Sequence, residues 1–282
     1  MPPLRKLAFV VNPNKPGAAE LAESLIAIAR DAGADVVITD TFPVAENFLE
    51  GRDACCVIGG DGTLLSVVVQ SVLGQVPIIG VNRGTLGFLT ILSPEEARDE
   101  FPSILEGAFH ISPRAVLHCG NDKANIALND IVIREAHSSR LISLDVFAND
   151  KWVTRFSCDG LIFSTPTGST AYNLSAGGPI THPNAHIIAM TPICPHTLSN
   201  RTVIFDENVQ LKVTNTKSDH PLAVVMDGQR QVSLNIGETL SIAMSPKKMP
   251  LVQPLNYAHF KVLRTKLGWN SPESRGGQLP GS

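Results

Sequence analysis

The stretch ACCVIGGDGTLLSVV, residues 54–68, places a glycine-rich turn between an apolar strand and an apolar helix. Ala54–Ile58 is a short apolar run typical of a buried strand, and Leu64–Leu73 follows as a predicted helix. Such a unit is typical of a parallel α/β sheet, in which ligands bind at the carboxyl ends of the strands. The stretch therefore predicts both a fold class and the place of a site.

Further strands and helices surround this unit in the first part of the chain. Leu7–Val11, Asp35–Thr39 and Val76–Val81 are predicted strands, and Ala18–Arg30 has the apolar spacing of a helix. We therefore predict an α/β domain over residues 1–110, with a twisted, mainly parallel, Rossmann-like sheet.

The pattern changes beyond about residue 110, where short β-rich segments replace the helices and predict an all-β, sandwich-like domain over residues 111–256. Residues 257–269 are predicted to return to the first domain as a strand or helix. Residues 270–282, rich in Ser, Pro and Gly, are a predicted disordered tail. The strands predicted in the second domain are Ala115–Cys119, Asn125–Arg134, Leu141–Ala148, Trp152–Phe156, Leu161–Ser164, His186–Met190, Val209–Val213, Leu222–Met226, Gln231–Leu234 and Thr239–Met244.

Two dipeptides in the second domain predict tight hairpin turns. Asn149-Asp150 and Asp227-Gly228 each separate two predicted strands. Both pairs tolerate the positive φ that two-residue hairpin loops require. We therefore expect antiparallel pairing on either side of each turn.

The composition indicates a folded protein with small-molecule partners. Hydrophobic residues make up 43% of the chain and charged residues 17%, which excludes a disordered chain. A net charge of −3 without a basic stripe argues against nucleic acid as a partner. No apolar stretch is long enough for a bilayer span or a signal peptide, so we expect a cytoplasmic protein and no membrane partner. The low charge content favours self-association over the alternative of a compact monomer.

The cysteines and histidines give no clear metal-ligand set. The chain has five cysteines and no C-x-x-C spacing, so we expect reduced thiols. Cys55 and Cys56 lie in a predicted strand and should point to opposite faces as core residues. His182 and His186 are four residues apart, but Pro183 between them prevents the helix that would align two ligands.

The glycine-rich turn has the residues of a phosphate-binding loop. Gly59, Gly60 and Thr63 lie where backbone N–H groups and a helix N-terminus can bind an anion. Asp61 would repel a phosphate there unless it bound a metal ion or accepted a proton from an attacking hydroxyl, which makes it a candidate catalytic base. The alternative is that Asp61 only caps the helix. The turn is neither a Rossmann fingerprint nor a P-loop, since Leu65 replaces the last glycine of G-x-G-x-x-G.

Two other segments carry polar groups suited to a nucleoside. Thr165–Tyr172 combines hydroxyls, a glycine and an aromatic ring after an apolar strand, although an ordinary loop is the alternative. Asn129-Asp130 interrupts the apolar segment Ile126–Ile133. Such a buried polar pair needs partners, which are either a ribose diol or neighbouring backbone.

Taken together and in order, these segments resemble the NAD kinase family over roughly residues 55–245. GGDGT alone is shared with diacylglycerol kinases and is similar to a motif of phosphofructokinases, whereas its combination with STPTGSTAY and P-H-x-L-S is specific. The resemblance rests on Gly59–Thr63, Gly80–Asn82, Leu86–Leu89, Leu128–Asp130, Asp159, Ser164–Tyr172, Ala176–Pro179 and Pro192–Ser199.

The resemblance implies an enzyme, a kinase that phosphorylates the 2′-hydroxyl of the adenosine ribose of NAD to give NADP. It implies ATP or inorganic polyphosphate as phosphoryl donor, a divalent metal such as Mg²⁺, and a dimer or tetramer. Two alternatives stay open, a non-catalytic NADP(H)-binding sensor and a lipid or sugar kinase that shares only the GGDGT loop.

The resemblance also implies roles for single residues. Asp61 would be the general base, Gly62 would line the same loop, Asn129 and Asp130 would hold the ribose, and Asp159 would contact the other end of the substrate. Two departures bear on this assignment. Asp130 stands where the family usually has Glu, and Ser157 replaces a position that is basic in some members. The further implied substrate contacts are Arg140, Thr170, Ala171, Tyr172, Asn173, Leu174, Ser175 and Gln229.

Overall fold

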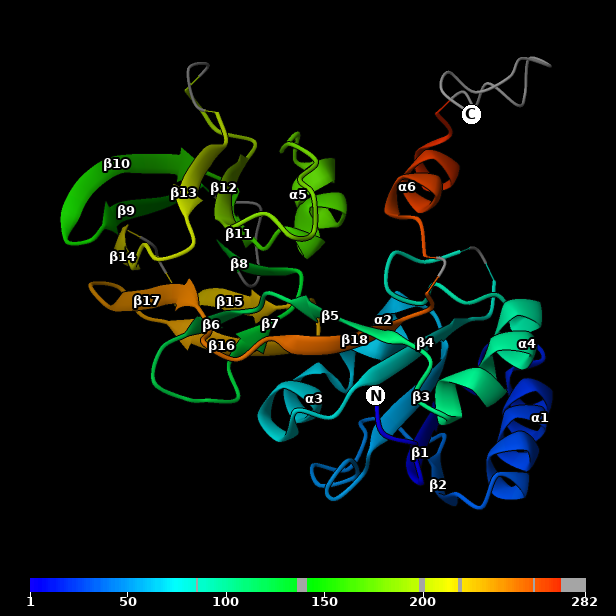
Figure 1. Cartoon of the computed structure of the whole chain (residues 1–282). Helices are drawn as coiled ribbons and strands as arrows, with labels where there is room; N and C mark the ends of the chain where they lie inside the picture. Colours follow the sequence, from blue (N-terminus) through cyan, green and yellow to red (C-terminus); the bar gives the residue numbers. More distant parts are fainter. Residues whose placement is uncertain (85, 136–140, 198–200, 218–219, 256, 270–282) are drawn as a thin grey trace. The chain divides into compact units, whose positions relative to one another are not determined.

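The computed structural model describes residues 1–84, 86–135, 141–197, 201–217, 220–255 and 257–269 and divides into two compact units (Figure 1). Unit 1 comprises Met1–Ser112 and the segment that begins at Pro250, and unit 2 comprises Pro113–Met249. The return to unit 1 thus begins earlier than residue 257, because strand β18 already pairs with the sheet of unit 1. The predicted tail, 270–282, lies outside the described residues.

Unit 1 is built on a mainly parallel sheet, as predicted, with strand order β2-β1-β3-β4-β18-β5. Strand β1 pairs in parallel with both β2 and β3, so the chain leaves β1 toward one side and later continues on the other. The carboxyl ends of β1 and β3 therefore flank a topological switch point, where ligands bind in open α/β sheets. The strands are β1 (Lys6–Val11), β2 (Asp35–Thr39), β3 (Ala54–Gly59), β4 (Ile78–Asn82), β5 (His110–Arg114) and β18 (Met249–Gln253).

The helices of unit 1 differ from the prediction at two places. The single helix expected at Leu64–Leu73 is divided into α2 and α3, and the Ser66 hydroxyl at the break donates to the Thr63 carbonyl at 2.7 Å. Helix α4 was not predicted, although Ser93 and Glu96 form a capping box at its start. The helices are α1 (Ala18–Asp31), α2 (Asp61–Leu65), α3 (Val68–Gly74), α4 (Pro94–Leu105) and α6 (His259–Leu267).

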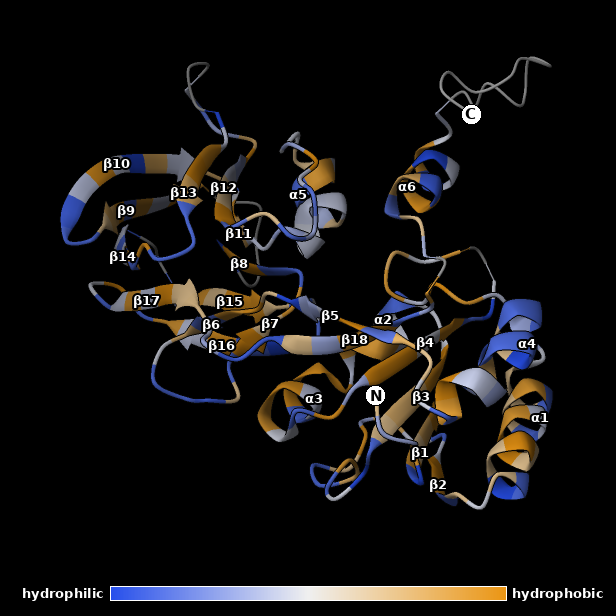
Figure 2. Ribbon diagram, in the orientation of Figure 1, coloured by the Kyte–Doolittle hydropathy of each residue, from blue (hydrophilic) through white to orange (hydrophobic). Residues whose placement is uncertain are grey.

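The core of unit 1 lies between the sheet and the apolar faces of its helices. Leu21 and Leu25 of α1 are fully buried, and the Phe9 ring meets the Phe101 ring edge-on at 6.0 Å between centroids. Cys55 and Cys56 are free thiols and fully buried, which confirms their prediction as core residues. Figure 2 shows the hydrophobic colouring of β3 in this core.

Unit 2 is the predicted antiparallel sandwich, with two six-stranded sheets. Their strand orders are β10-β9-β14-β17-β6-β7 and β13-β12-β11-β8-β15-β16. Both predicted hairpin turns are confirmed, since Asn149, Asp150, Asp227 and Gly228 all have positive φ. The strands are β6 (Leu117–Cys119), β7 (Ile126–Ala127), β8 (Asp130–Glu135), β9 (Ile142–Ala148), β10 (Lys151–Cys158), β11 (Gly160–Ser164), β12 (Ile187–Ile193), β13 (Val203–Asp206), β14 (Leu211–Lys217), β15 (Leu222–Met226), β16 (Arg230–Leu234) and β17 (Thr239–Met244).

The strand predicted at Asn125–Arg134 is in fact two strands. β7 belongs to the first sheet of unit 2 and β8 to the second, so the chain crosses between the sheets at Leu128-Asn129. Leu128 and Asn129 therefore lie at a corner of the sandwich, between the two strands, and Asp130 is the first residue of β8. No helix in the described part of the chain is long and apolar enough to cross a membrane.

Candidate active site

The glycine-rich turn of unit 1 lies at the switch point between β1 and β3. Gly59 ends β3, and the Thr63 side chain lies against its Cα so closely that a Cβ at Gly59 would collide with it. The Asn12 amide, just after β1, donates to the Thr63 hydroxyl at 2.9 Å. The carboxyl ends of the two strands are thus tied together by Asn12 and Thr63, and the side chain of Thr63 has a structural role in the loop.

Asp61 is held by a segment that follows β4. Its Oδ1 accepts hydrogen bonds from Leu89 N, Thr90 N and Thr90 Oγ1 at 2.9–3.1 Å, and its Oδ2 accepts one from Phe88 N at 2.9 Å. Gly60 is the N-cap residue of α2, so the alternative in which Asp61 caps the helix is wrong. A carboxylate oxygen commonly accepts two hydrogen bonds. Oδ1 exceeds this number with its three donors, whereas Oδ2 has one donor among the described residues and can accept a further donor or a metal ion.

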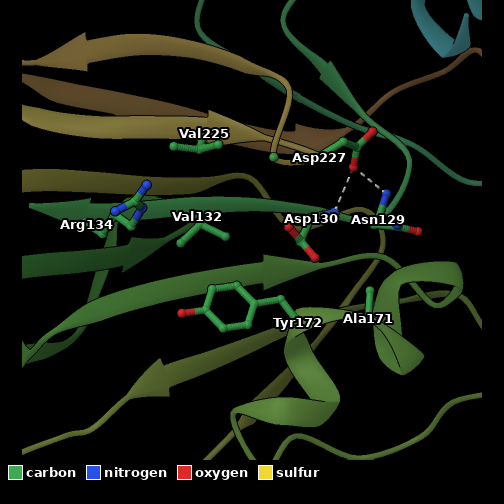
Figure 3. Close-up of a pocket in the computed structure, with 9 residues that line it drawn as sticks. Asn129, Asp130, Val132, Arg134, Ala171, Tyr172, Val225 and Asp227 are labelled. Carbon is green, nitrogen blue, oxygen red and sulfur yellow. Dashed lines mark hydrogen bonds between the residues drawn. The ribbon is translucent and has the colours of Figure 1, made fainter. Parts of the chain in front are cut away.

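A cavity of about 470 Å³ lies in unit 2, and Figure 3 shows the residues that line it. Two segments that the sequence analysis singled out meet here, one from the start of β8 and one from the loop after β11. The lining residues are Asn129, Asp130, Val132, Arg134, Ala171, Tyr172, Val225, Asp227 and Gly228.

The Thr165 side chain fastens the second segment to the first. Its hydroxyl donates to the Leu128 carbonyl at 2.5 Å and accepts from Gly168 N at 3.0 Å, while its own N–H donates to the Asn129 carbonyl at 2.9 Å. A Cβ at Gly168 would collide with the Asn129 backbone, so only glycine allows this approach. The hydroxyl and glycine of this loop thus shape the cavity wall.

Asp227, which the sequence analysis treated only as a turn residue, organises the corner from the other side. Its carboxylate accepts hydrogen bonds from the N–H groups of Leu128 and Asn129 at 2.7 Å and of Asp130 at 3.1 Å. Figure 3 shows the bonds to Asn129 and Asp130. No pattern in the sequence pointed to this role, because it depends on which segment the hairpin packs against.

The two carboxyls of the cavity have raised pKa values. Burial and, to a smaller extent, the nearby Asp227 together raise the pKa of Asp130 to about 7, although a hydrogen bond from the Tyr172 N–H opposes the shift. Burial raises the pKa of Asp227 to about 6 against the effect of its three backbone donors. Near neutral pH the Asp130 carboxyl is therefore present in both protonation states and can donate or accept a hydrogen bond.

Comparison with protein families matches residues 38–109 to the ATP-NAD kinase N-terminal domain and residues 128–254 to the ATP-NAD kinase C-terminal domain. The chain belongs to the NAD kinase family. The NAD kinase of Pseudomonas entomophila (strain L48) is 39% identical over 227 residues, 78% of this chain and 76% of the relative. That of Hahella chejuensis (strain KCTC 2396) is 37% identical over 270 residues, 92% of this chain and 90% of the relative.

Two solved structures of this family have a similar fold. The crystal structure of yeast NADH kinase complexed with NADH has a TM-score of 0.84 and 25% identity, with 99% of this chain and 90% of that chain covered. An NAD kinase from Archaeoglobus fulgidus in complex with ATP has a TM-score of 0.76 and 26% identity, with 92% and 99% covered. The family resemblance and the fold class predicted from the sequence are thereby confirmed.

Four of the predicted substrate contacts line the cavity of unit 2, and the others lie elsewhere. Asn129, Asp130, Ala171 and Tyr172 are cavity residues. Arg140 lies outside the described residues. The other predicted contacts of unit 2 do not line this cavity; they are the half-buried Asp159, Thr170 and Leu174, the exposed Ser175 and Gln229, and the buried Asn173.

The side chain of Asn173 lies in the core of unit 2 instead of facing the cavity. Its Nδ2 donates to the carbonyls of Ser169 and Pro179 at 3.2 and 3.1 Å, and its Oδ1 accepts from the Thr191 hydroxyl at 2.6 Å. We therefore correct the prediction that the Asn173 side chain contacts substrate, because both of its polar atoms are bonded to the protein. Asn173 thus holds the end of the Gly177-Gly178 segment, where its side chain bonds the Pro179 carbonyl and its own carbonyl accepts from Gly178 N.

A preassembled metal site is not found in the part of the chain that the structure describes, since no group of three or more His, Cys, Asp or Glu side chains could hold a metal ion. His186, one of the histidines considered from the sequence, pairs with Glu207 at 2.8 Å. Gly62 is exposed beside Asp61 at the start of α2. A metal ion at the glycine-rich turn would thus take most of its ligands from bound phosphates and water, with Asp61 as the neighbouring carboxylate.

Asp227→Asn should destabilise the protein by about 1–3 kcal/mol. In either orientation of the new amide, its NH₂ group faces at least one backbone N–H that donates to the carboxylate in the unmodified protein. Two donors then face each other, and that hydrogen bond is lost. Asp150→Asn is the matched control, since Asp150 lies in the other predicted hairpin turn, also has positive φ, and forms a surface ion pair with Lys212. Urea unfolding at pH 7.5 should show a change within about 0.5 kcal/mol for this control; equal effects of the two variants would contradict the role of Asp227.

Asp130→Asn should gain stability relative to the unmodified protein as the pH rises. Because the pKa of Asp130 is raised in the folded state, the folded protein retains a proton that the unfolded chain releases above about pH 4. The unmodified protein therefore loses stability between about pH 4 and pH 7, by up to about 4 kcal/mol, and the Asn variant lacks this loss.

The measurement is urea unfolding at a series of pH values between 4 and 8. The test is how the stability difference between Asp130→Asn and the unmodified protein changes with pH. The size of the difference at one pH is not enough, since Asn can also shift stability by a constant amount. Asp145→Asn is the control, because Arg155 lowers the pKa of Asp145 and removes any slope from this pH window. A difference that stays flat for Asp130→Asn would rule out the raised pKa.

Proposed function

We propose that this chain transfers a phosphoryl group from ATP or inorganic polyphosphate to the 2′-hydroxyl of the adenosine ribose of NAD, which gives NADP. Membership of the NAD kinase family supports this proposal, as do a relative in complex with ATP and another in complex with NADH. The observation that carries it is the Asp61 carboxylate, fixed by four hydrogen bonds at the switch point of the sheet.

Asp61 would act as the general base of this reaction. The three donors on Oδ1 fix the carboxylate plane, and the open position on Oδ2 can accept the proton of the attacking hydroxyl. Gly59 and Gly60 have no side chains, so phosphate oxygens can approach their backbone closely. Gly62 would line the same loop against the dinucleotide.

The cavity of unit 2 would hold a nucleoside part of NAD. The Asn129 amide and the Asp130 carboxyl can bond ribose hydroxyls, and the 43% exposed Tyr172 ring offers a flat apolar surface to a base or ribose. Asp130 has a shorter side chain than the Glu usual in the family, so its reach into the cavity depends on the backbone position that Asp227 fixes.

Mg²⁺ would be bound at the glycine-rich turn through phosphate oxygens and water, because the open position on Asp61 Oδ2 is assigned to the attacking hydroxyl. When bound, the ion would neutralise charge on the transferred phosphoryl group. We also propose a dimer or tetramer in the cytoplasm; the low content of charged residues supports the self-association.

Asp61→Asn should lower the turnover of NADP formation by about 10²–10⁴-fold, the range of general-base catalysis. NAD binding should be largely retained. Thr90→Val is the control, since it removes one donor to Oδ1 and leaves the carboxylate in place. Its turnover should fall less than that of Asp61→Asn, because the carboxylate and its three backbone donors remain. Near-normal turnover of Asp61→Asn in a correctly folded protein would exclude the general base.

The reaction itself is tested by incubating the protein with NAD and Mg²⁺, separately with ATP and with polyphosphate. NADP is measured through a coupled NADP-specific dehydrogenase. NADP from either donor supports the proposal and identifies the donor. Tight NADP(H) binding without phosphoryl transfer from either donor would select the non-catalytic sensor instead, and transfer only to a lipid or sugar would select the other kinase.

A further inference from the structure

Arg134 lies in the same cavity as Asp130, at the far end of one strand face. Asp130, Val132 and Arg134 alternate along β8 and all three line the cavity (Figure 3). Residues two apart in a strand share one face, and four residues span about 13 Å. The carboxyl and the guanidinium therefore stand at opposite ends of one binding surface.

The surface between these two ends is apolar and open. Val132 pairs directly with Val225 of the neighbouring strand β15, and both valines line the cavity. Arg134 pairs with Gly160 on one side and with Ala223 on the other, so its neighbours in the sheet are small and leave room for the guanidinium. The Tyr172 ring lies across the cavity from β8 in Figure 3.

The acidic and basic groups of the cavity lie at opposite ends of it. Asp130 and Asp227 are the acidic groups, and Arg134 is the one basic group among the described residues that line it. In the part of the chain that the structure describes, the exposed Arg134 side chain forms no hydrogen bond or ion pair. Asp130 is too far along the strand to pair with it. A guanidinium with its donors free, beside an apolar floor, is suited to bind an oxyanion through two parallel hydrogen bonds.

We infer that Arg134 binds a phosphate group of the dinucleotide, while Asp130 binds hydroxyl groups of the attached nucleoside. This inference rests on the proposed function and extends it to a residue that the sequence analysis did not identify. It makes the cavity selective for ligands that carry an anion and a sugar hydroxyl at opposite ends, with a ring system over Val132 and Val225 between them.

The test uses the full chain and the variant Arg134→Gln, which keeps a polar side chain and removes the charge. Binding of NAD, AMP and adenosine is measured by titration calorimetry. The variant should bind NAD and AMP about 10- to 100-fold more weakly, the range for hydrogen bonds to charged groups, and adenosine within about twofold of the unmodified protein. Arg134→Lys should fall between the two, since Lys keeps the charge without the paired donors.

Two controls separate phosphate binding from an effect on the fold. Arg155→Gln removes an exposed arginine that pairs with Asp145 outside the cavity, and it should leave all three affinities unchanged. The NAD affinity of the unmodified protein should fall more steeply with salt than that of Arg134→Gln. An equal loss of affinity for AMP and adenosine, or no loss for either, would overturn the inference.

Enzyme kinetics distinguish this inference from the proposed function. If the unmodified protein forms NADP, Arg134→Gln should raise KM for NAD about tenfold or more and leave kcat within about twofold. An unchanged KM would overturn the role of Arg134. If the unmodified protein binds NAD but forms no NADP, the proposed function fails, and the comparison of AMP with adenosine still decides whether Arg134 binds phosphate.

Discussion

The cavity of unit 2 depends on how the chain turns a corner between two sheets. At Leu128 and Asn129 the backbone leaves one sheet and enters the other, and its N–H groups cannot all be satisfied by strand pairing. A buried N–H group without a partner costs about 1–3 kcal/mol. The Asp227 carboxylate satisfies three consecutive N–H groups at once, and Thr165 bonds the carbonyls on the other side. Asn129 and Asp130 are thereby presented to the cavity in a fixed direction.

The glycine-rich turn of unit 1 uses the same kind of interaction. Asp61, like Asp227, precedes a glycine in a turn and accepts hydrogen bonds from consecutive backbone N–H groups of a segment distant in sequence. The close approach requires Gly87, where a Cβ would collide with the Asp61 carboxylate. The two carboxylates differ in the segment that each one holds. Asp227 holds the corner that carries Asn129 and Asp130, whereas the segment after β4 holds Asp61 itself at the carboxyl end of β3.

The sequence was informative where structure follows from local rules. Apolar runs, glycine turns and the two hairpin dipeptides predicted the strands around residues 54–68 and the turns at Asn149 and Asp227. It failed where tertiary packing decides, as in the division between α2 and α3. Family motifs identified the loop that contains Asn173 but could not separate ligand contacts from residues that hold the loop. Arg134 gave no signal, because a charged residue in a strand has meaning only once its face is known.

A carboxyl group that titrates near neutrality inside a binding cavity makes ligand binding an acid–base event. A ligand hydroxyl that donates to Asp130 favours the ionised form and expels a proton, whereas a ligand acceptor retains the proton. The heat of binding then includes the ionisation enthalpy of the buffer. Enthalpies measured in two non-phosphate buffers of different ionisation enthalpy will differ in proportion to the protons exchanged, and the part of this difference that Asp130→Asn removes belongs to the Asp130 side chain.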